Sequence, residues 1–389
     1  MYERGHMLNS TIDKCNALFE KAARQRHIVI FRESLQKLLV FWVCIGICLL
    51  LAKYATSYPM GQLSSIAIMI MMASYIYCIS GGIARSLGAS GSACGLATVF
   101  VCFLCSYQTL IDKPLRDYAI WLLLSIVLGE LYGFLSRFRF DNRLMPHQAE
   151  GYLSELFPCI GTMLLGMFIG FLSPLFFPLI RSVFLWIAHG IDSLVAVVVL
   201  VVVTAVGKLY FPQLPKIVRA VIRPFWIYMS LANLYYFFHK GAYPFITTEA
   251  FYHWFVWVGG AGGGLGLAID LLVLNRSKDR FTGLKCVQET LFNLDERVMD
   301  EVIVKNRKKL AIPYISVPVI TAVIMYLATA WGYLKPSRLL SPWMLPGPLG
   351  GWLATGLDGW AILASLICIL ISMLVYLPFV ISICKGEKA

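Results

Sequence analysis

Long runs of apolar residues recur along the whole 389-residue chain, and short polar segments separate them. A helix that crosses a bilayer needs about 20 mostly apolar residues. By this criterion we expect ten spans, at 38–56, 62–80, 94–111, 118–136, 156–179, 183–206, 222–238, 251–274, 311–333 and 360–384. The pattern therefore predicts an all-α polytopic membrane protein with about ten transmembrane helices.

The first 37 residues are polar and basic, but they carry apolar residues at a helical spacing. Ile12, Cys15, Leu18 and Phe19 share one face of the expected helix, and basic side chains lie between them. Such a segment is typical of an amphipathic leader that lies on the cytoplasmic surface of the membrane. A leader helix packed on the protein itself is an equally good interpretation.

Two stretches in the later half fit no simple span. Residues 279–310 are too charged to cross lipid, and residues 335–359 are hydrophobic but rich in Pro and Gly. Irregular backbone at membrane depth is tolerated only against protein or a water-filled cavity. We therefore expect re-entrant hairpins or cavity linings there, because transporters place substrate sites at such broken elements.

Composition and charge support a membrane protein and argue against a nucleic-acid-binding one. The chain is 59% hydrophobic and 14% charged, whereas soluble domains carry about 25% charged residues. The net charge of +12 is explained by basic clusters that follow the even-numbered spans. Basic loops stay in the cytoplasm, so we expect a multi-pass protein of the plasma membrane with both termini cytoplasmic. The eleven scattered cysteines show no metal-ligand spacing, and we expect neither a metal nor a cofactor.

A glycine-rich stretch, GGAGGGLG, begins at Gly259 inside an otherwise apolar span. A dinucleotide-binding loop is disfavoured, because Leu267 stands where that fingerprint has Gly or Ala and no βαβ pattern surrounds it. Gly260 and Gly264 form a GxxxG pair suited to close helix packing. A break in the span that lines a polar pathway is the other interpretation, and both can hold. Asp270, in the same span, should face the protein interior or a water-filled cavity.

Several segments resemble a known family of sugar transporters. ITTEAFYHWFVWVGGAGGGLGLAI and PGPLGGWLATGLDGWAILASLICILISMLVYLPF are similar to two specific signatures of the IIC membrane subunit from the lactose/cellobiose/diacetylchitobiose branch of the phosphoenolpyruvate-dependent sugar phosphotransferase system. The leader NALFEKAARQRHIVIFRESLQKLLVFW and the segment MPHQAEGYLSELFPCIG resemble less specific parts of that family. The likeness runs over nearly the whole length and implies the IIC fold of the glucose superfamily.

The resemblance also implies an organisation and partners. It implies a homodimer in which 1–37 is the cytoplasmic leader, 38–207 the transmembrane dimerisation scaffold, and 208–389 the transport domain that moves as an elevator. An oligosaccharide would be the substrate, the lipid bilayer the surroundings, and separate IIB and IIA subunits would deliver the phosphoryl group. We expect separate subunits because the chain shows no cytosolic domain of about 100 residues.

The candidate catalytic residue comes from the segment FNLDERVMDEVIVKNRKKLAIPYISVP, which resembles the family's Asn-Glu-Pro sugar-site region. Glu296 stands at the motif glutamate, Asp295 replaces its Asn, and Arg297 replaces its Pro. The resemblance implies that Glu296 accepts a hydrogen bond from a sugar hydroxyl and acts as general base while that hydroxyl attacks the partner's phosphocysteine. A solvated cytoplasmic loop of paired charges is the other interpretation of these three residues.

The remaining candidates for substrate binding are Asp295, Asn293, Gly259, Gly260 and Trp343. Trp343 could stack on a sugar ring, or it could be an interfacial belt residue. The family's substrate histidine is missing, since Leu231 stands near its expected position and His239 is out of place.

A sugar permease subunit is therefore the leading hypothesis, and whether the chain counts as an enzyme stays open. The altered motifs leave two further classes: a divergent relative with a sensor or regulatory role or a non-sugar substrate, and an ion- or proton-coupled transporter that uses Asp270 and Glu296.

Overall fold

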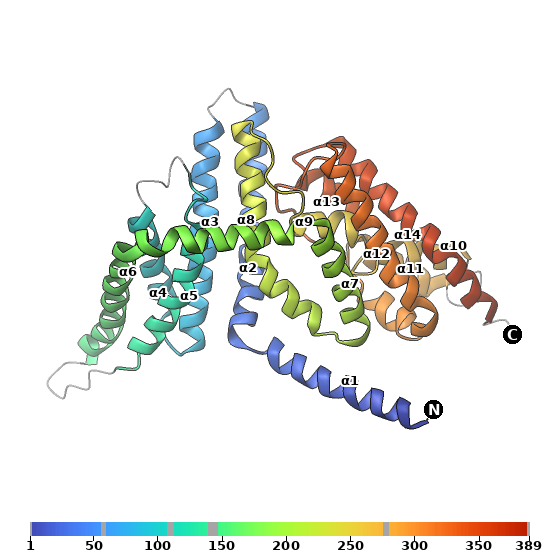
Figure 1. The fold of residues 1–389 in the computed structure, drawn as a ribbon, viewed down its shortest axis with the longest axis horizontal. Helices are drawn as coiled ribbons and strands as arrows, with labels where there is room; N and C mark the ends of the chain where they lie inside the picture. The colour runs from blue at the N-terminus through green and yellow to red at the C-terminus, as the bar shows by residue number, and fades with distance from the viewer. Residues whose placement is uncertain (1, 56–59, 107–112, 139–146, 275–279, 387–389) are drawn as a thin grey trace. The chain divides into compact units, whose positions relative to one another are not determined.

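The computed structural model describes residues 2–55, 60–106, 113–138, 147–274 and 280–386, and every regular element in these ranges is helical. The elements are α1 (Tyr2–Ala23), α2 (Arg26–Ala55), α3 (Met60–Ser86), α4 (Gly91–Ser106), α5 (Tyr118–Leu135), α6 (His147–Ile191), α7 (Leu194–Tyr210), α8 (Leu214–His239), α9 (Glu249–Phe251), the π-helix η1 (Tyr252–Val256), α10 (Gly264–Leu274), α11 (Arg280–Leu291), the π-helix η2 (Val298–Ile303), α12 (Arg307–Ala330), α13 (Gly347–Ala354) and α14 (Gly359–Gly386) (Figure 1). The all-α class predicted from the sequence is confirmed in the part of the chain that the structure describes.

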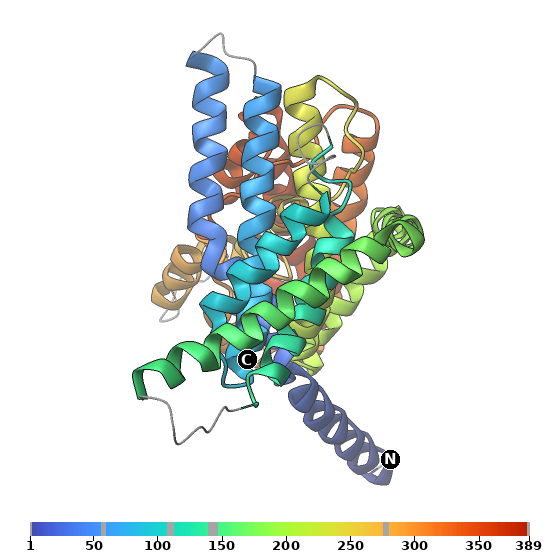
Figure 2. The same cartoon turned by 90° about the vertical axis from the view of Figure 1, so that its left-hand side faces the viewer.

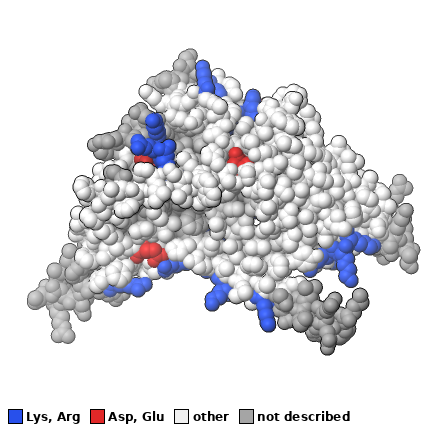
Figure 3. Space-filling model, viewed as in Figure 1, with Lys and Arg blue, Asp and Glu red and all other residues white. Residues whose placement is uncertain are grey.

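Six helices are long and apolar enough to cross a membrane, or seven if the bent pair Leu175–Ile191 and Leu194–Tyr210 counts as one span, within the residues that the structure describes. This pair bends by 71°. Figure 3 shows that charged side chains on the visible face form small groups, with wide areas between them that carry none. Such a surface suits a lipid environment, and the count of ten spans stays a prediction.

The chain divides into two compact units, which are described one at a time. The N-terminal unit comprises Arg24–Ala188, and the C-terminal unit comprises Met1–Ala23 together with His189–Ala389. The assignment of 38–207 to a dimerisation scaffold and 208–389 to a transport domain stays a prediction.

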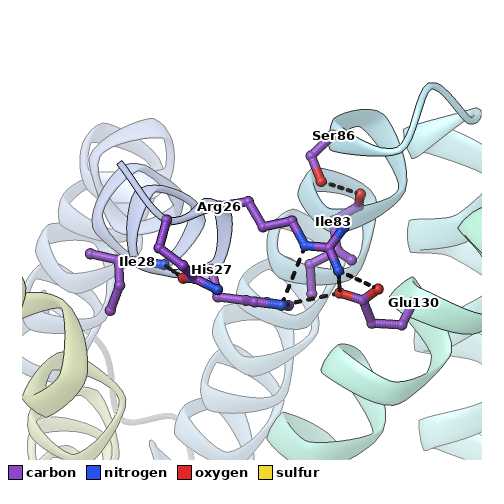
Figure 4. Close-up of polar contacts among 7 residues, drawn as sticks. Arg26, His27, Ile28, Ile83, Ser86 and Glu130 are labelled. Atoms are coloured by element: carbon purple, nitrogen blue, oxygen red, sulfur yellow. Dashed lines mark hydrogen bonds and ion pairs between the residues drawn. The ribbon is translucent and has the colours of Figure 1, made fainter. Parts of the chain in front are cut away.

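In the N-terminal unit α3 is the central helix, and it packs against α2, α4 and α5. Figure 1 and Figure 2 both show α2 and α3 side by side. The indole of Trp42 on α2 donates to the Ser74 hydroxyl on α3 at 2.9 Å, which satisfies a polar group inside an apolar contact. The Arg26 guanidinium and the His27 ring of α2 both lie against the Glu130 carboxylate of α5, at 2.5 and 3.1 Å (Figure 4).

In the C-terminal unit α10 packs between α11 and α14, and α12 packs against α7 and α14. Their shared core is apolar and includes Leu267, Val317 and Tyr376. Leader helix α1 contacts α8, and the Phe19 ring lies 5.5 Å from that of Phe211. The leader thus packs on protein, as one of its two interpretations has it, and its contact with a lipid surface stays a prediction.

The helix bounds differ from the expected spans at several places, and two of these differences concern the ends of α2 and α6. Helix α2 begins at Arg26, so the first expected span extends back into the expected leader. Helix α6 runs without interruption through 180–182, where we expected a loop, and the chain turns only after Ile191. The turn comes there because Ser193 caps α7: its side chain accepts a hydrogen bond from the Ala196 amide at 3.3 Å.

The expected re-entrant segment 335–359 consists of an irregular stretch followed by the short helix α13. The backbone amides of Arg338 and Leu339 both donate to the Ala354 carbonyl, at 2.9 and 3.0 Å, which closes the segment into a loop. Arg338 is buried, and its guanidinium lies 3.8 Å from the centre of the Phe237 ring. The segment is therefore ordered against protein, as irregular apolar backbone requires.

Candidate functional site

The glycine-rich stretch is a break between two helical elements. The π-helix η1 ends at Val256, residues 257–263 form turns, and α10 begins at Gly264. Gly259 and Gly260 have φ angles of +78° and +108°, which side chains with a Cβ rarely adopt. A Cβ on Gly262 would lie 2.2 Å from the Tyr314 ring, so the break is also closely packed. The stretch is thus a break, as one interpretation has it, and helix packing by the Gly260 and Gly264 pair stays a prediction, because Gly260 lies outside α10.

A loop from the charged segment 279–310 docks on this break. The Gly259 amide donates to the Asn293 side-chain carbonyl at 2.6 Å, and the Ala261 amide donates to an Asp295 carboxylate oxygen at 3.0 Å. Asn293 has a φ of +59°, a conformation that Asn tolerates better than most residues. The two side chains thus satisfy backbone amides that the broken helix leaves without intrahelical partners.

Basic side chains from α7 and α8 face the same break. Lys208 of α7 donates to the other Asp295 carboxylate oxygen at 3.0 Å. On α8 the Arg219 guanidinium lies over the Trp257 ring, 4.5 Å from its centre. A guanidinium over an indole face is held by cation–π attraction, which fixes Arg219 beside the break.

One turn further along α8, Arg223 forms a buried ion pair with Glu249. Its Nη2 and Nε atoms donate to the two carboxylate oxygens at 2.7 and 3.2 Å. The two side chains are only 5% and 9% exposed. A bidentate pair of this kind satisfies both oxygens of Glu249 and orients the start of α9 against α8.

These elements enclose a cavity of about 210 Å³. Its lining combines cations, backbone of the break, and polar side chains of the docking loop. The lining residues are Thr204, Lys208, Pro212, Pro215, Lys216, Arg219, His253, Trp257, Gly260, Ala261, Asn293 and Asp295. All of them belong to the C-terminal unit.

Four hydrogen-bonding groups of the lining are buried and make no hydrogen bond within the part of the chain that the structure describes. One is the Thr204 hydroxyl, which can donate or accept, and the other three can only donate. These three are Nε of Arg219, Nδ2 of Asn293 and Nε1 of Trp257. A buried donor without a partner costs about 1–3 kcal/mol. The cavity can therefore bind a ligand rich in hydrogen-bond acceptors.

Comparison with solved structures identifies the fold. The chain matches the crystal structure of the transporter ChbC, the IIC component from the N,N'-diacetylchitobiose-specific phosphotransferase system, with a TM-score of 0.81. The match covers 96% of this chain and 97% of that one, at 20% sequence identity. The chain has the IIC transporter fold. This confirms the fold that the sequence resemblance implies.

The sequence is similar to that of known permease components over a shorter segment than the one covered by the structural match. The lichenan permease IIC component of Bacillus subtilis is 30% identical over 166 residues, which is 42% of this chain and 37% of the relative. The cellobiose-specific EIIC component of Lactococcus lactis is 30% identical over 150 residues, 38% of this chain and 30% of the relative. The matched segments thus span about a third of these relatives' length. No family model matches the sequence.

The cavity brings together three of the residues predicted from the sequence: Asp295, Asn293 and Gly260. Gly259 lies next to them and donates its amide to Asn293. Glu296 is exposed and is not among the lining residues, so the carboxylate that faces this cavity belongs to its neighbour Asp295. The catalytic role of Glu296 stays a prediction. Arg297 binds Glu289 at 2.7 Å and Glu301 at 3.4 Å, and these contacts hold it to α11 and η2.

Trp343 lies beside the cavity histidine. The His253 ring nitrogen is 3.1 Å from the Trp343 carbonyl oxygen, and the two rings are 6.4 Å apart. The Arg223 guanidinium is 5.3 Å from the centre of the Trp343 ring. The indole thus packs beside residues that surround the site, and its stacking on a sugar stays a prediction.

The sequence analysis did not predict that His253 and the basic residues Lys208, Lys216 and Arg219 line the cavity. Leu231, near the position expected for the family's histidine, is buried and apolar, whereas His253 of η1 lines the cavity. The basic residues were interpreted only as a topological signal. Lys216, Arg219 and Arg223 are spaced i, i+3 and i+7, which places them on one face of a helix. This spacing could have revealed a shared target.

Proposed function

We propose that this chain is the membrane permease subunit of a sugar phosphotransferase system. It translocates a disaccharide-like sugar, which a separate IIB subunit phosphorylates after receiving the phosphoryl group from IIA. The observation that carries the proposal is the cavity at the glycine break, lined by Asp295 and Asn293, in a chain with the IIC fold. Similarity to a cellobiose-specific EIIC component and to a lichenan permease IIC component supports a sugar of that class.

The cavity chemistry is compatible with a sugar. A hydroxyl group can donate to a carboxylate in a charge-assisted hydrogen bond, and it can accept from the free donors of Asn293 and Trp257. During phosphoryl transfer the sugar oxygen attacks phosphorus, the sulfur–phosphorus bond of the partner's phosphocysteine breaks, and the hydroxyl proton passes to a carboxylate. Asp295 or its neighbour Glu296 would receive that proton.

Transport requires that the cavity face each side of the membrane in turn. We infer an elevator movement of 208–389 against a dimerisation scaffold formed by 38–207, in a homodimer with both termini in the cytoplasm. The family resemblance and the broken span next to the cavity support this arrangement, because transporters bind substrate at such breaks.

Uptake measurements test the proposal. Cells expressing the chain are given labelled β-linked disaccharides, with and without the general phosphotransferase proteins and the matching IIB and IIA subunits. We expect accumulation of phosphorylated sugar only when all components are present. Absence of uptake for every sugar in the panel would refute the proposal.

Two carboxamide variants identify the functional carboxylate. Because Asp295 lines the cavity and Glu296 is exposed, we expect Asp295→Asn to reduce uptake by at least about tenfold, which corresponds to about 1.4 kcal/mol. Glu296→Gln tests the motif-based assignment in the same assay. Asp300→Asn removes a carboxylate that is also exposed and serves as the matched control. Normal uptake by Asp295→Asn would remove Asp295 from the site.

A sensor or regulatory role is the second candidate. Both Asp295 oxygens already have partners, Lys208 and the Ala261 amide, so ligand entry has to compete with an existing ion pair. Two results together would favour this role: the purified protein binds a sugar tightly, and cells that express the protein do not take up that sugar.

A further inference from the structure

We propose that the cavity selects an acidic sugar, meaning a saccharide that carries a carboxylate, sulfate or phosphate group. This inference rests on the proposed function and specifies its substrate class. It comes from the balance of charges and of hydrogen-bonding groups around the cavity.

The charge balance of the lining is positive. Lys208, Lys216 and Arg219 line the cavity, and Asp295 is the carboxylate among the lining residues. Lys208 forms an ion pair with Asp295 at 3.0 Å. Lys216 and Arg219 therefore remain as the excess charge of the lining.

The carboxylate of Glu249, outside the lining, does not cancel this excess. Glu249 attracts Arg219 electrostatically, but both of its oxygens are bound by Arg223 at 2.7 and 3.2 Å. Arg223 thus brings its own positive charge to the same region. Arg219 is held over Trp257 with its Nε atom buried and without a hydrogen bond to any of the described residues. A guanidinium in this state is a binding site for an oxyanion.

The hydrogen-bonding groups also favour an anion over a neutral hydroxyl. Of the four buried lining groups without partners, three, at Arg219, Asn293 and Trp257, can only donate, and the fourth is the Thr204 hydroxyl, which can donate to an anion as well. A hydroxyl can accept from them, but it also brings a proton that needs an acceptor. Asp295, the carboxylate of the lining, already accepts from Lys208 and from the Ala261 amide. An oxyanion only accepts, so it satisfies the donors without adding another unmet donor.

A binding experiment with the full chain tests this inference. The protein is reconstituted in nanodiscs of phosphatidylcholine, and equilibrium binding is measured for one β-linked disaccharide in four forms: neutral, with a 6-carboxylate, with a 6-sulfate and with a 6-phosphate. We expect at least one acidic form to bind about tenfold or more tightly than the neutral form, the gain typical of a charge-assisted contact. Raising the salt concentration should reduce this preference, because exposed charges are screened.

Variants assign the preference to the cavity. Arg219→Gln should remove most of the preference, while Lys216→Gln, at an exposed position, should reduce it by about threefold. Lys216→Gln keeps the test valid if the first variant does not fold. Lys113→Gln, an exposed cation of the N-terminal unit, is the control and should leave the preference unchanged.

The outcomes separate this inference from the function on which it rests. Equal or weaker binding of all three acidic forms overturns the inference, as does a preference that survives both cavity variants. If cells take up and phosphorylate the neutral disaccharide but none of its acidic forms, the proposed function stands and the inference falls. If they take up none of the four forms and the protein binds none, both fall.

Discussion

Replacing Gly260 by alanine would disturb the glycine break at the point where it supports Asp295. A Cβ at this position would lie 2.2 Å from the Asp295 Cβ and 2.6 Å from its Oδ2. The φ angle of +108° is also one that residues with a Cβ rarely adopt. The substitution therefore adds backbone strain and pushes the Asp295 side chain away from its partners.

The two effects can be given magnitudes. The strained backbone costs about 1–2 kcal/mol. Displacing Asp295 breaks its hydrogen bond with the Ala261 amide and its ion pair with Lys208. Hydrogen bonds to charged groups contribute about 1.5–3 kcal/mol each. Lys208 is 32% exposed, so water screens its pair and the lower end of that range applies to it. We expect a total loss of about 4–6.5 kcal/mol in the free energy of unfolding.

Two other glycines provide controls. Gly332 has a φ of +81°, and the place that an alanine methyl group would take there has no neighbour within 4 Å, so Gly332→Ala should show the strain alone. Gly190 lies in α6, has open space around it and no positive φ, so Gly190→Ala should be neutral or stabilising by up to about 1 kcal/mol. In thermal unfolding of the detergent-purified variants, the unfolding temperature should therefore be highest for Gly190→Ala, lower for Gly332→Ala and lowest for Gly260→Ala. Only Gly260→Ala should also lose uptake. If Gly260→Ala unfolds at the same temperature as Gly332→Ala and keeps its uptake, then Asp295 does not depend on this glycine.

Two further predictions concern buried polar contacts of the C-terminal unit. Arg223→Met or Glu249→Gln alone should destabilise the protein by about 3–5 kcal/mol, because each removes one charge of a buried ion pair. The double variant should recover much of this loss, and a coupling below about 0.5 kcal/mol in a double-mutant cycle of thermal unfolding would contradict the prediction. Asp192 accepts hydrogen bonds from the Ile246 amide and from both the amide and hydroxyl of Thr247. Asp192→Ala should therefore lower the unfolding temperature and speed proteolysis near 246, at a cost of about 1–3 kcal/mol per unmet donor, and unchanged proteolysis would count against this role.

Much of the helical architecture could be predicted from the apolar runs, because the local sequence of a run is enough to specify a membrane helix. The break after α6 could not be placed this way, since 156–206 is apolar almost throughout. The physical determinants of the turn are Asp192, which binds backbone amides of 246–247, and Ser193, which caps α7. The capping residue was visible in the sequence, but the partner of Asp192, more than 50 residues away, was not.

The site was also predictable only in part, because some of its contacts join residues that are far apart in the sequence. Family resemblance pointed to the glycines and to the loop with Asn293 and Asp295, and the structure brings these together. The contact of Asp295 with Lys208 joins residues 87 positions apart, and no local pattern predicts it. The positive-inside rule gave a sufficient explanation for the basic residues after the sixth span, so their second role as cavity lining was overlooked.

The altered sugar motif and the basic lining are best understood together. A carboxylate at 295, where the family resemblance implies an Asn, is costly inside an apolar unit unless a cation accompanies it. Lys208 is that cation, and the pair leaves Lys216 and Arg219 without a matching negative charge in the lining. A site that had merely decayed would lose charged groups, because each of them is expensive to bury. This cavity instead holds its cations by specific contacts, with Asp295 for Lys208 and with Trp257 for Arg219. The proposed acidic ligand therefore accounts for the departures from the motif as a change of ligand rather than as the loss of a binding site.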